Sequence, residues 1–160
     1  MCLYVNDSNM KPKVAKENIT CYKVLEEYST DNGVSFHTPF RFMDVELGKT
    51  YVDDNEVIIK KSECNGNSYG TIKSGVFHSF KEYIDAVSLL EKVGVCDPVF
   101  VVECVIPKGT EYYEGTFDDG EPCYGSKTIQ YKEKILAKYF WSNEYNKYLT
   151  EYPNSDAEFV

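Results

Sequence analysis

The chain has 160 residues, of which 42% are apolar, and it carries a formal charge of −9 at pH 7. This length and composition predict one domain with a sizeable core. The negative charge argues against direct binding to DNA or RNA, because attraction to phosphates depends on clustered Lys and Arg. A basic protein surface is the partner that the charge favours.

The beginning of the chain and its cysteines predict a cytoplasmic, intracellular protein. The early apolar run Leu3-Tyr4-Val5 is too short for a signal-peptide core or a membrane span. The six cysteines are widely spaced without a CxxC pair, so we expect reduced thiols. A zinc site would need His37 and His78 to meet from distant positions, and the spacing predicts no metal site.

The first half of the chain predicts short strands joined by turns. Residues 1–18 are mostly polar and aperiodic, which predicts an extended N-terminal lead-in. Strand-forming residues fill 20–25, and Asp31-Asn32-Gly33 supplies residues that suit a turn. Further strands are expected at 43–47 and 57–59, with a loop at 65–70.

A helix is predicted over 80–93. Ser79 and Glu82 have the spacing of a capping box, in which both side chains satisfy backbone donors at a helix start. Apolar residues then recur at helical spacing: Phe80, Tyr83, Ile84, Val87 and Leu90. We favour capping over a ligand contact for Ser79, so Ser79→Ala should lower stability by roughly 0.5 to 2 kcal/mol.

Two strands are predicted in the second half. The run 99–106 is apolar on both faces apart from Glu103 and Cys104, which is typical of a central strand, and a central Glu103 needs a partner. From Lys127 to Ala137, apolar and polar residues alternate. Glu133 falls on the apolar side, either because it lies at a strand end or at the rim of the sheet, which we favour, or because it is an inward-facing functional carboxylate.

An aromatic stripe near the C-terminus predicts a second helix over about 142–152. Trp141, Tyr145, Tyr148 and Tyr152 recur at helical spacing before Pro153. We favour docking of this stripe onto the protein's own core over contact with a partner. Residues 153–160 are expected to form a loose tail. The elements together predict one α+β domain over 19–152, with a mixed or mainly antiparallel sheet and two main helices.

Acidic and aromatic side chains gather in a stretch without a base. The acids are Glu111, Glu114, Asp118, Asp119 and Glu121, and the aromatic residues among them are Tyr112, Tyr113 and Phe117. A solvated acidic loop is the interpretation we favour. The alternative is a partner surface, in which charge steers the encounter and aromatic area holds the complex. Trp141, Tyr145 and Tyr148 are the second candidate surface.

Three segments in order resemble the layout of ADP-ribosyltransferase-like domains. They are 21–25, then Gly75-Val76-Phe77-His78-Ser79-Phe80, then 101–110 with Pro107-Lys108-Gly109. The resemblance covers 19–137 and implies an ADP-ribosyltransferase-like arrangement with NAD near Tyr22, Phe77, His78 and Ser79. The family's Arg or His on the first strand and its Glu-x-Glu motif are missing. Glu133 and Glu121 are the carboxylates that could substitute.

The sequence therefore supports two functions of different classes. The first is a non-catalytic protein-binding or inhibitory protein without a cofactor, of the kind encoded by phages and mobile elements to counter defence systems (anti-CRISPR-like). It would act on a basic partner, such as the nucleic-acid-binding channel of a protein complex. The second is an NAD-dependent ADP-ribosyltransferase with an unorthodox carboxylate. A structural protein that self-associates through its aromatic C-terminus is a third alternative.

Overall fold

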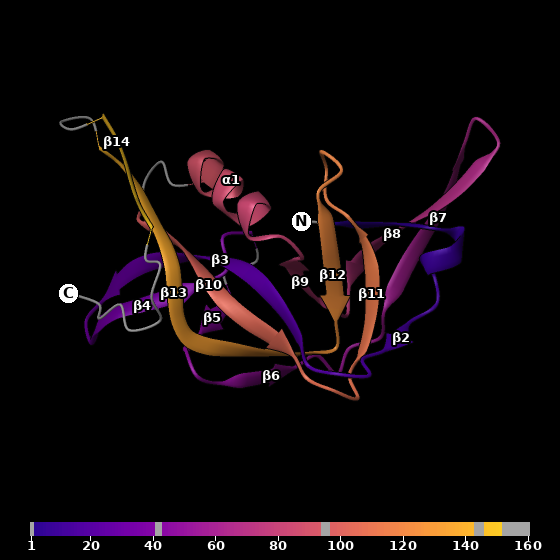
Figure 1. The fold of residues 1–160 in the computed structure, drawn as a ribbon, viewed down its shortest axis with the longest axis horizontal. Helices are drawn as coiled ribbons and strands as arrows, with labels where there is room; N and C mark the ends of the chain where they lie inside the picture. Colours follow the sequence, from indigo (N-terminus) through magenta and orange to yellow (C-terminus); the bar gives the residue numbers. More distant parts are fainter. Residues whose placement is uncertain (1, 41–42, 94–96, 143–145, 152–160) are drawn as a thin grey trace. The chain divides into compact units, whose positions relative to one another are not determined.

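The computed structural model describes residues 2–40, 43–93, 97–142 and 146–151, with the backbone alone at 141–142 and 146–151 (Figure 1). Strands make up 59% of the structure and helices 10%. One α-helix, α1 (Tyr83–Val93), occurs among these residues. The structure is mainly antiparallel sheet, so the predicted α+β class with two main helices is wrong. No helix in the described ranges is long and apolar enough to cross a membrane.

The chain divides into two compact units. Unit 1 contains Met1–Cys21, Thr50–Glu82 and Val105–Gln130, and unit 2 contains Tyr22–Lys49, Tyr83–Cys104 and Tyr131–Val160. No change in composition marks this division in the sequence, because each unit is assembled from three separate stretches of the chain.

Unit 1 is an antiparallel sheet of short strands. Its order is β9 (Phe77–Phe80), β12 (Pro122–Ser126), β11 (Glu111–Thr116), β1 (Leu3–Asn6), β8 (Asn67–Ser74) and β7 (Ile58–Cys64). The short strand β2 (Lys13–Val14) pairs with β11, and β6 (Thr50–Val52) pairs with Thr128–Gln130 at the start of β13 (Thr128–Ser142).

The predicted lead-in over 1–18 is wrong, because this segment belongs to the sheet. It contains β1, the 3-10 helix η1 (Asp7–Asn9) and β2. In β1, Leu3 and Val5 are buried, whereas Tyr4 and Asn6 are exposed. Four alternating residues are enough for a strand when both neighbours, β8 and β11, supply hydrogen-bonding partners.

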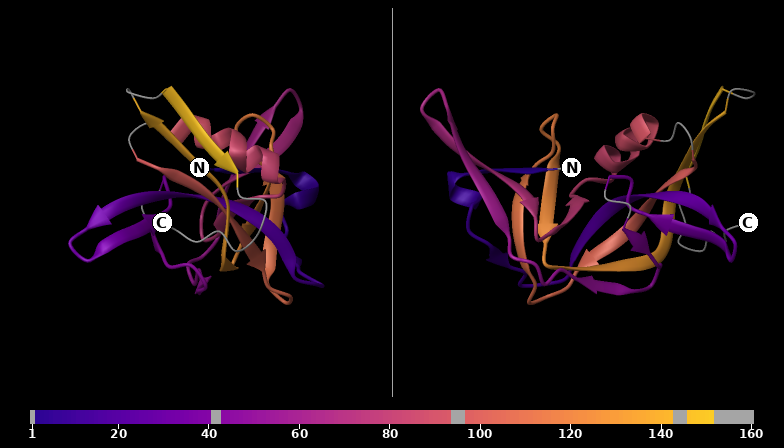
Figure 2. Two further views of the ribbon diagram at one scale, coloured as in Figure 1. Left: turned by 60° about the vertical axis from the view of Figure 1, so that its left-hand side comes forward. Right: turned by 180° about the vertical axis from the view of Figure 1, so that it is seen from behind.

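The hairpin of β7 and β8 shows how local sequence sets the turns of unit 1. Asn65 and Gly66 have positive φ values of 52° and 77°. Cys64 pairs with Asn67, so these two residues form the whole turn. Asn-Gly is the preferred sequence for such a two-residue hairpin. The segment predicted as a loop over 65–70 is therefore a tight turn followed by a strand, and the hairpin is visible in Figures 1 and 2.

Unit 2 combines longer strands with α1. Its strands are β3 (Ile19–Thr30), β4 (Gly33–His37), β5 (Asp44–Val45), β10 (Val99–Ile106), β13 and β14 (Asn146–Glu151), and β3, β10 and β13 begin or end in unit 1. The boundaries of β10 agree with the predicted strand over 99–106. Glu103, only 13% exposed, has the partner it was expected to need, since Lys132 Nζ lies 2.8 Å from its carboxylate.

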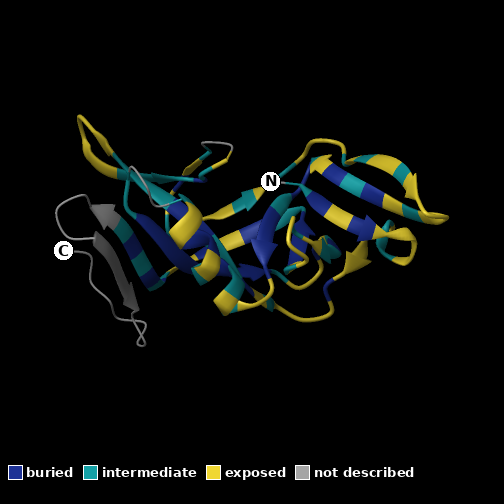
Figure 3. Ribbon diagram, turned by 90° about the horizontal axis from the view of Figure 1, so that it is seen from above, coloured by how far each residue is buried: buried dark blue, intermediate teal, exposed yellow. Residues whose placement is uncertain are grey.

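The helix prediction over 80–93 is correct in type and wrong in its start. Ser79 lies in β9, opposite Tyr124, so it cannot cap α1, which begins at Tyr83. Ile84 is 66% exposed, and the buried face consists of Ala86, Leu89 and Leu90 (Figure 3). Both the predicted and the observed faces have helical spacing, so the sequence pattern did not distinguish them.

The predicted helix over 142–152 is wrong, because the described residues 146–151 form a strand. β13 continues to Ser142, and β14 returns beside it with Phe140 opposite Tyr148 and Trp141 opposite Lys147. Aromatic residues and Thr favour strands, and pairing with β13 outweighs the helical spacing of the aromatic residues. Tyr145, Tyr152 and the expected tail over 153–160 lie outside the described residues.

The buried Ser79 hydroxyl leads to a prediction opposite to that of the capping box. Ser79 is 1% exposed, and its Oγ has no hydrogen-bond partner among the described residues. Such a hydroxyl contributes no net stability, because its desolvation is not offset. Ser79→Ala should therefore leave the free energy of unfolding within about 0.5 kcal/mol of the wild type, or raise it. Urea unfolding measures this change, and a loss of about 1 kcal/mol or more would restore the capping interpretation.

Candidate functional site

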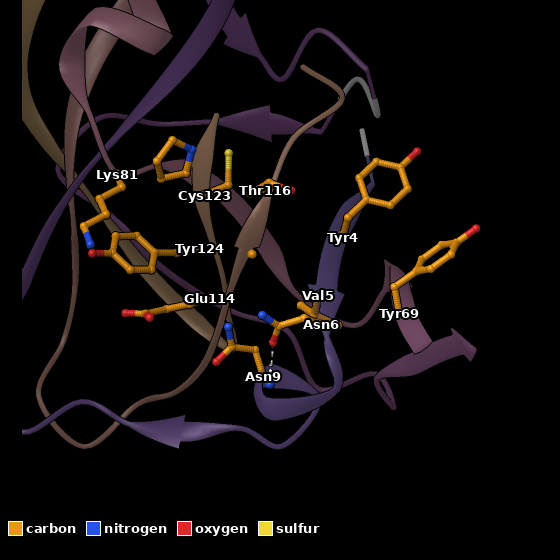
Figure 4. A pocket seen from close by; sticks show the side chains of 12 residues that line it. Tyr4, Val5, Asn6, Asn9, Tyr69, Lys81, Glu114, Thr116, Cys123 and Tyr124 are labelled. Carbon is orange, nitrogen blue, oxygen red and sulfur yellow. Dashed lines mark hydrogen bonds between the residues drawn. The ribbon is translucent and has the colours of Figure 1, made fainter. Parts of the chain in front are cut away.

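A pocket of about 410 Å³ lies in unit 1. Figure 4 shows Lys81, Tyr124 and Glu114 at one end of it and Tyr4 and Tyr69 at the other. Asn6, Asn9 and Thr116 are further labelled lining residues. Its lining residues come from β1, η1, β8, β11, β12 and the residue after β9, so the site depends on the pairing of distant stretches of the chain.

The register of the strands explains why these side chains share a face. Residues directly opposite each other in an antiparallel pair point to the same side of the sheet. Tyr124 is opposite Glu114, Tyr4 is opposite Thr116, and Asn6 is opposite Tyr69. The strand period of two places all of them on one face of the sheet.

The opposite face of the same strands is the core. Leu3 is opposite Ile72, Val5 is opposite Gly70, and Gly115 is opposite Cys123. A Cβ atom on Gly115 would lie 2.2 Å from the carbonyl oxygen of Tyr4, which no side chain can tolerate. Glycine at position 115 therefore allows β11 to lie close against β1, and this contact holds two strands of the pocket together.

Negative charge surrounds the tyrosine hydroxyls at both ends of the pocket. The negative charge of the nearby Asp118 carboxylate is the main cause that raises the pKa of Tyr4 above its usual value, followed by burial. Burial, followed by the carboxylate of Glu114, raises the pKa of Tyr124 to about 12. Both shifts mean that a further negative charge is unfavourable there.

Two lysines moderate this negative charge. Lys13 Nζ lies 2.9 Å from the Glu114 carboxylate, although both side chains are substantially exposed, so the pair contributes little stability. Lys81 is exposed and lines the same end of the pocket as Tyr124. It has no ion-pair partner among the described residues.

The acidic turn between β11 and β12 is an ordered structure. Phe117 N donates to Glu121 O at 2.8 Å, and Gly120 N donates to Phe117 O at 2.9 Å. The Glu121 carboxylate accepts from Asp119 N at 3.1 Å. The ring of Phe117 packs edge-on against Phe80, with centroids 6.0 Å apart. The turn therefore presents its carboxylates from a fixed backbone.

The residues predicted to bind a partner divide between surface and core. Glu111, Asp118 and Asp119 are exposed, and Glu114 lines the pocket. Tyr113 is 7% exposed and lies on the core face, so it supplies packing and almost no contact area. Tyr112 packs edge-on against Tyr124 at 5.9 Å. Trp141 lies in β13 and Tyr148 in β14, whereas Tyr145 falls outside the described residues.

The residues predicted to bind NAD belong to different units. Phe77, His78 and Ser79 lie in β9 of unit 1, where His78 and Ser79 are buried. Tyr22 belongs to unit 2 and packs edge-on against Tyr83 at 5.8 Å. Of the two candidate carboxylates, Glu121 belongs to unit 1 and holds the acidic turn, and Glu133 belongs to unit 2 and is exposed.

Tyr4, Tyr69 and Lys81 line the pocket but were not predicted from the sequence. The alternation Leu3-Tyr4-Val5-Asn6 could have indicated a strand with Tyr4 and Asn6 on its polar face. No local signal shows that Tyr69 would lie beside this strand, because their pairing joins segments more than sixty residues apart. Across the described ranges, no group of His, Cys, Asp and Glu side chains could hold a metal ion.

The raised pKa of Tyr124 predicts a pH dependence of stability. A tyrosine in an unfolded chain ionises near 10.0, whereas folded Tyr124 stays neutral up to about 12. The contribution of this group is fully present below pH 10 and is lost as the pH rises through the folded pKa, because the unfolded state releases its proton first. Ionisation of this group should lower the free energy of unfolding of the wild type by up to about 3 kcal/mol between pH 10 and 12. Tyr124→Phe should not show this decrease.

Urea unfolding of the wild type and of Tyr124→Phe at several alkaline pH values measures this contribution. Tyr51→Phe serves as the control. It removes another tyrosine hydroxyl, and Tyr51 lies in β6, which pairs with β13 and contributes no residue to the pocket. Parallel stability curves for the wild type and Tyr124→Phe would show that Tyr124 ionises normally.

A scan against protein-family models, a search of curated proteins and a search of solved structures gave no match for this chain. The assignment of a site therefore rests on the geometry and charge of the chain's own residues.

Proposed function

We propose that this protein is a non-catalytic binding protein that docks a basic surface of a partner protein on the pocket face of unit 1. The observation that carries the proposal is the gathering of Tyr4, Tyr69, Glu114 and Asp118 on one side of the sheet. Carboxylates attract the partner and aromatic side chains provide contact area at a low cost in side-chain entropy.

The chemistry of this face suits a protein partner better than a small anionic substrate. Tyr4 and Tyr69 are each 37% exposed, so their rings offer contact area to a partner. Asp118 and Asp119 lie on the ordered turn, and the charge of Asp118 acts on the Tyr4 hydroxyl. A ligand with negative charge would meet these carboxylates and Glu114, with Lys81 as the favourable group.

A basic nucleic-acid-binding channel is the class of partner surface that this proposal includes. Such channels present Arg and Lys side chains to phosphates, and a carboxylate-rich protein of charge −9 can compete for them. Inhibitors carried by phages or mobile elements act in this way on defence complexes. A cytoplasmic location belongs to the same proposal, since widely spaced cysteines without a CxxC pair suit a reducing compartment.

Removing charge from the acidic turn should slow association. In the triple variant Asp118→Asn, Asp119→Asn and Glu121→Gln, the amides can keep the hydrogen bond that holds the turn. Association with an immobilised peptide of alternating Lys, Arg and Ser should slow roughly five- to tenfold, and its dependence on salt should flatten. Surface-binding kinetics at two salt concentrations measures both effects.

A matched variant removes the same charge elsewhere. Asp31→Asn, Glu63→Gln and Glu91→Gln change three exposed carboxylates outside the pocket and the acidic turn. This control should retain most of the wild-type association rate, because steering depends on local potential more than on net charge. Equal slowing in both triple variants would mean non-specific attraction and would contradict the proposal.

Lys81 distinguishes a basic ligand from an anionic one. If the ligand is basic, Lys81→Gln removes a repulsive charge from the pocket and should tighten peptide binding about two- to fivefold. If the ligand is an anion such as a nucleotide, the same change should weaken binding. Calorimetric titration with the basic peptide and with NAD tests both outcomes, and NAD binding that is lost in Lys81→Gln would overturn the proposal.

A further inference from the structure

Tyr4 and Tyr69 occupy diagonal positions on neighbouring strands. Tyr4 is opposite Thr71, and Tyr69 is opposite Asn6, so the two tyrosines lie on the same face and two residues apart in register. Figure 4 shows both rings projecting from β1 and β8 at one end of the pocket. The effect of the Tyr69 phenol on the pKa of Tyr4 agrees with this proximity.

The spacing of such a diagonal pair matches the thickness of one planar group. Diagonal residues on neighbouring antiparallel strands have Cβ atoms roughly 7 Å apart. Carbon atoms in contact are about 3.5 Å apart, so one flat group between two rings needs about twice that distance. The register therefore places the two side chains far enough apart at their Cβ atoms for one planar side chain of a partner to lie between them.

Asp118 supplies the charge partner at the hydroxyl end of Tyr4. Its negative charge acts on the Tyr4 hydroxyl, and its carboxylate can accept several hydrogen bonds because it has about four acceptor positions. A planar cation lying against the Tyr4 ring could therefore donate to this carboxylate. Asp118 is exposed, so a partner side chain can approach it from solvent.

Among side chains of a basic partner, arginine fits this arrangement best. Its guanidinium group is planar, stacks on aromatic rings and donates a pair of parallel hydrogen bonds to a carboxylate. A lysine ammonium is a compact and strongly hydrated charge that uses neither planar stacking nor a fork of donors. We propose that Tyr4, Tyr69 and Asp118 form a binding site for one arginine side chain of the partner, an inference that rests on the proposed function.

Peptides that differ at one position test this site. One peptide carries a central arginine within a Lys, Ser and Gly background, the second carries lysine there, and the third carries citrulline, which keeps the planar shape without the charge. The arginine peptide should bind roughly five- to tenfold more tightly than the lysine peptide. Its advantage over the citrulline peptide should be at least as large. Calorimetry or fluorescence titration gives the three dissociation constants.

Variants of the protein locate the preference. Tyr69→Leu and Asp118→Asn should each reduce the preference for arginine over lysine to less than about twofold, whereas Tyr69→Phe should keep it because the ring remains. Tyr51→Leu in β6 lies outside the pocket and should keep it as well. Circular dichroism and urea unfolding confirm that each variant is folded.

The outcomes separate the inference from the proposed function. If the arginine and lysine peptides bind equally, and Tyr69→Leu changes neither, the arginine site is overturned while binding of basic partners stands. If no basic peptide binds the wild-type protein, both proposals are overturned. An arginine preference that survives in both Tyr69→Leu and Asp118→Asn would also overturn the site, because another part of the protein would then be responsible.

Discussion

The close approach of β11 to β1 is the constraint on which the pocket depends. Gly115 allows it, because any side chain at this position would collide with the carbonyl oxygen of Tyr4. The approach brings Thr116 opposite Tyr4 and joins the hairpin of β11 and β12 to the N-terminal strand. Without this pairing of β11 with β1, Tyr4 would not share a sheet face with Glu114 and Tyr124. Because Gly115 has no side chain on the core face, the pocket can form on the opposite face.

Carboxylates make the pocket face negative, and two lysines offset part of this charge. The charge of Asp118 is the main cause that raises the pKa of Tyr4, whereas burial, followed by the charge of Glu114, raises the pKa of Tyr124. Lys13 offsets part of the charge on Glu114. Lys81 lies near Tyr124 and would limit the number of cations that the pocket can accept.

Unit 2 uses charge differently, as an internal support of its strands. Glu103, in the middle of an otherwise apolar β10, is held by Lys132 at 2.8 Å and Lys134 at 3.6 Å. His37 lies 3.2 Å from Glu26 and stacks on Tyr28, whose hydroxyl donates to Asp44 at 2.6 Å. His37 in β4 lies opposite Glu26 in β3 and opposite Asp44 in β5, so the polar groups of this cluster stabilise the register of the three strands.

The sequence by itself determined the features that depend on near neighbours. The apolar run of β10, the alternation of Ile129, Tyr131, Ile135 and Ala137, the turn at 31–33 and the need of Glu103 for a partner all follow from local pattern, and the structure agrees. It also identified the acidic residues between Glu111 and Glu121. The neighbours of these acidic residues, however, depend on strand pairing between segments far apart in the sequence.

Tertiary structure decided the cases in which local preference and pairing compete. Ser79 has the spacing of a helix cap, yet pairing with Tyr124 makes it part of a strand. The C-terminal aromatic residues have helical spacing, yet pairing with β13 makes 146–151 a strand. Tyr4 and Tyr69 share a face only because β1 pairs with β8. Strand pairing links residues far apart in sequence, and for that reason short-range patterns could not show which side chains would meet in the pocket.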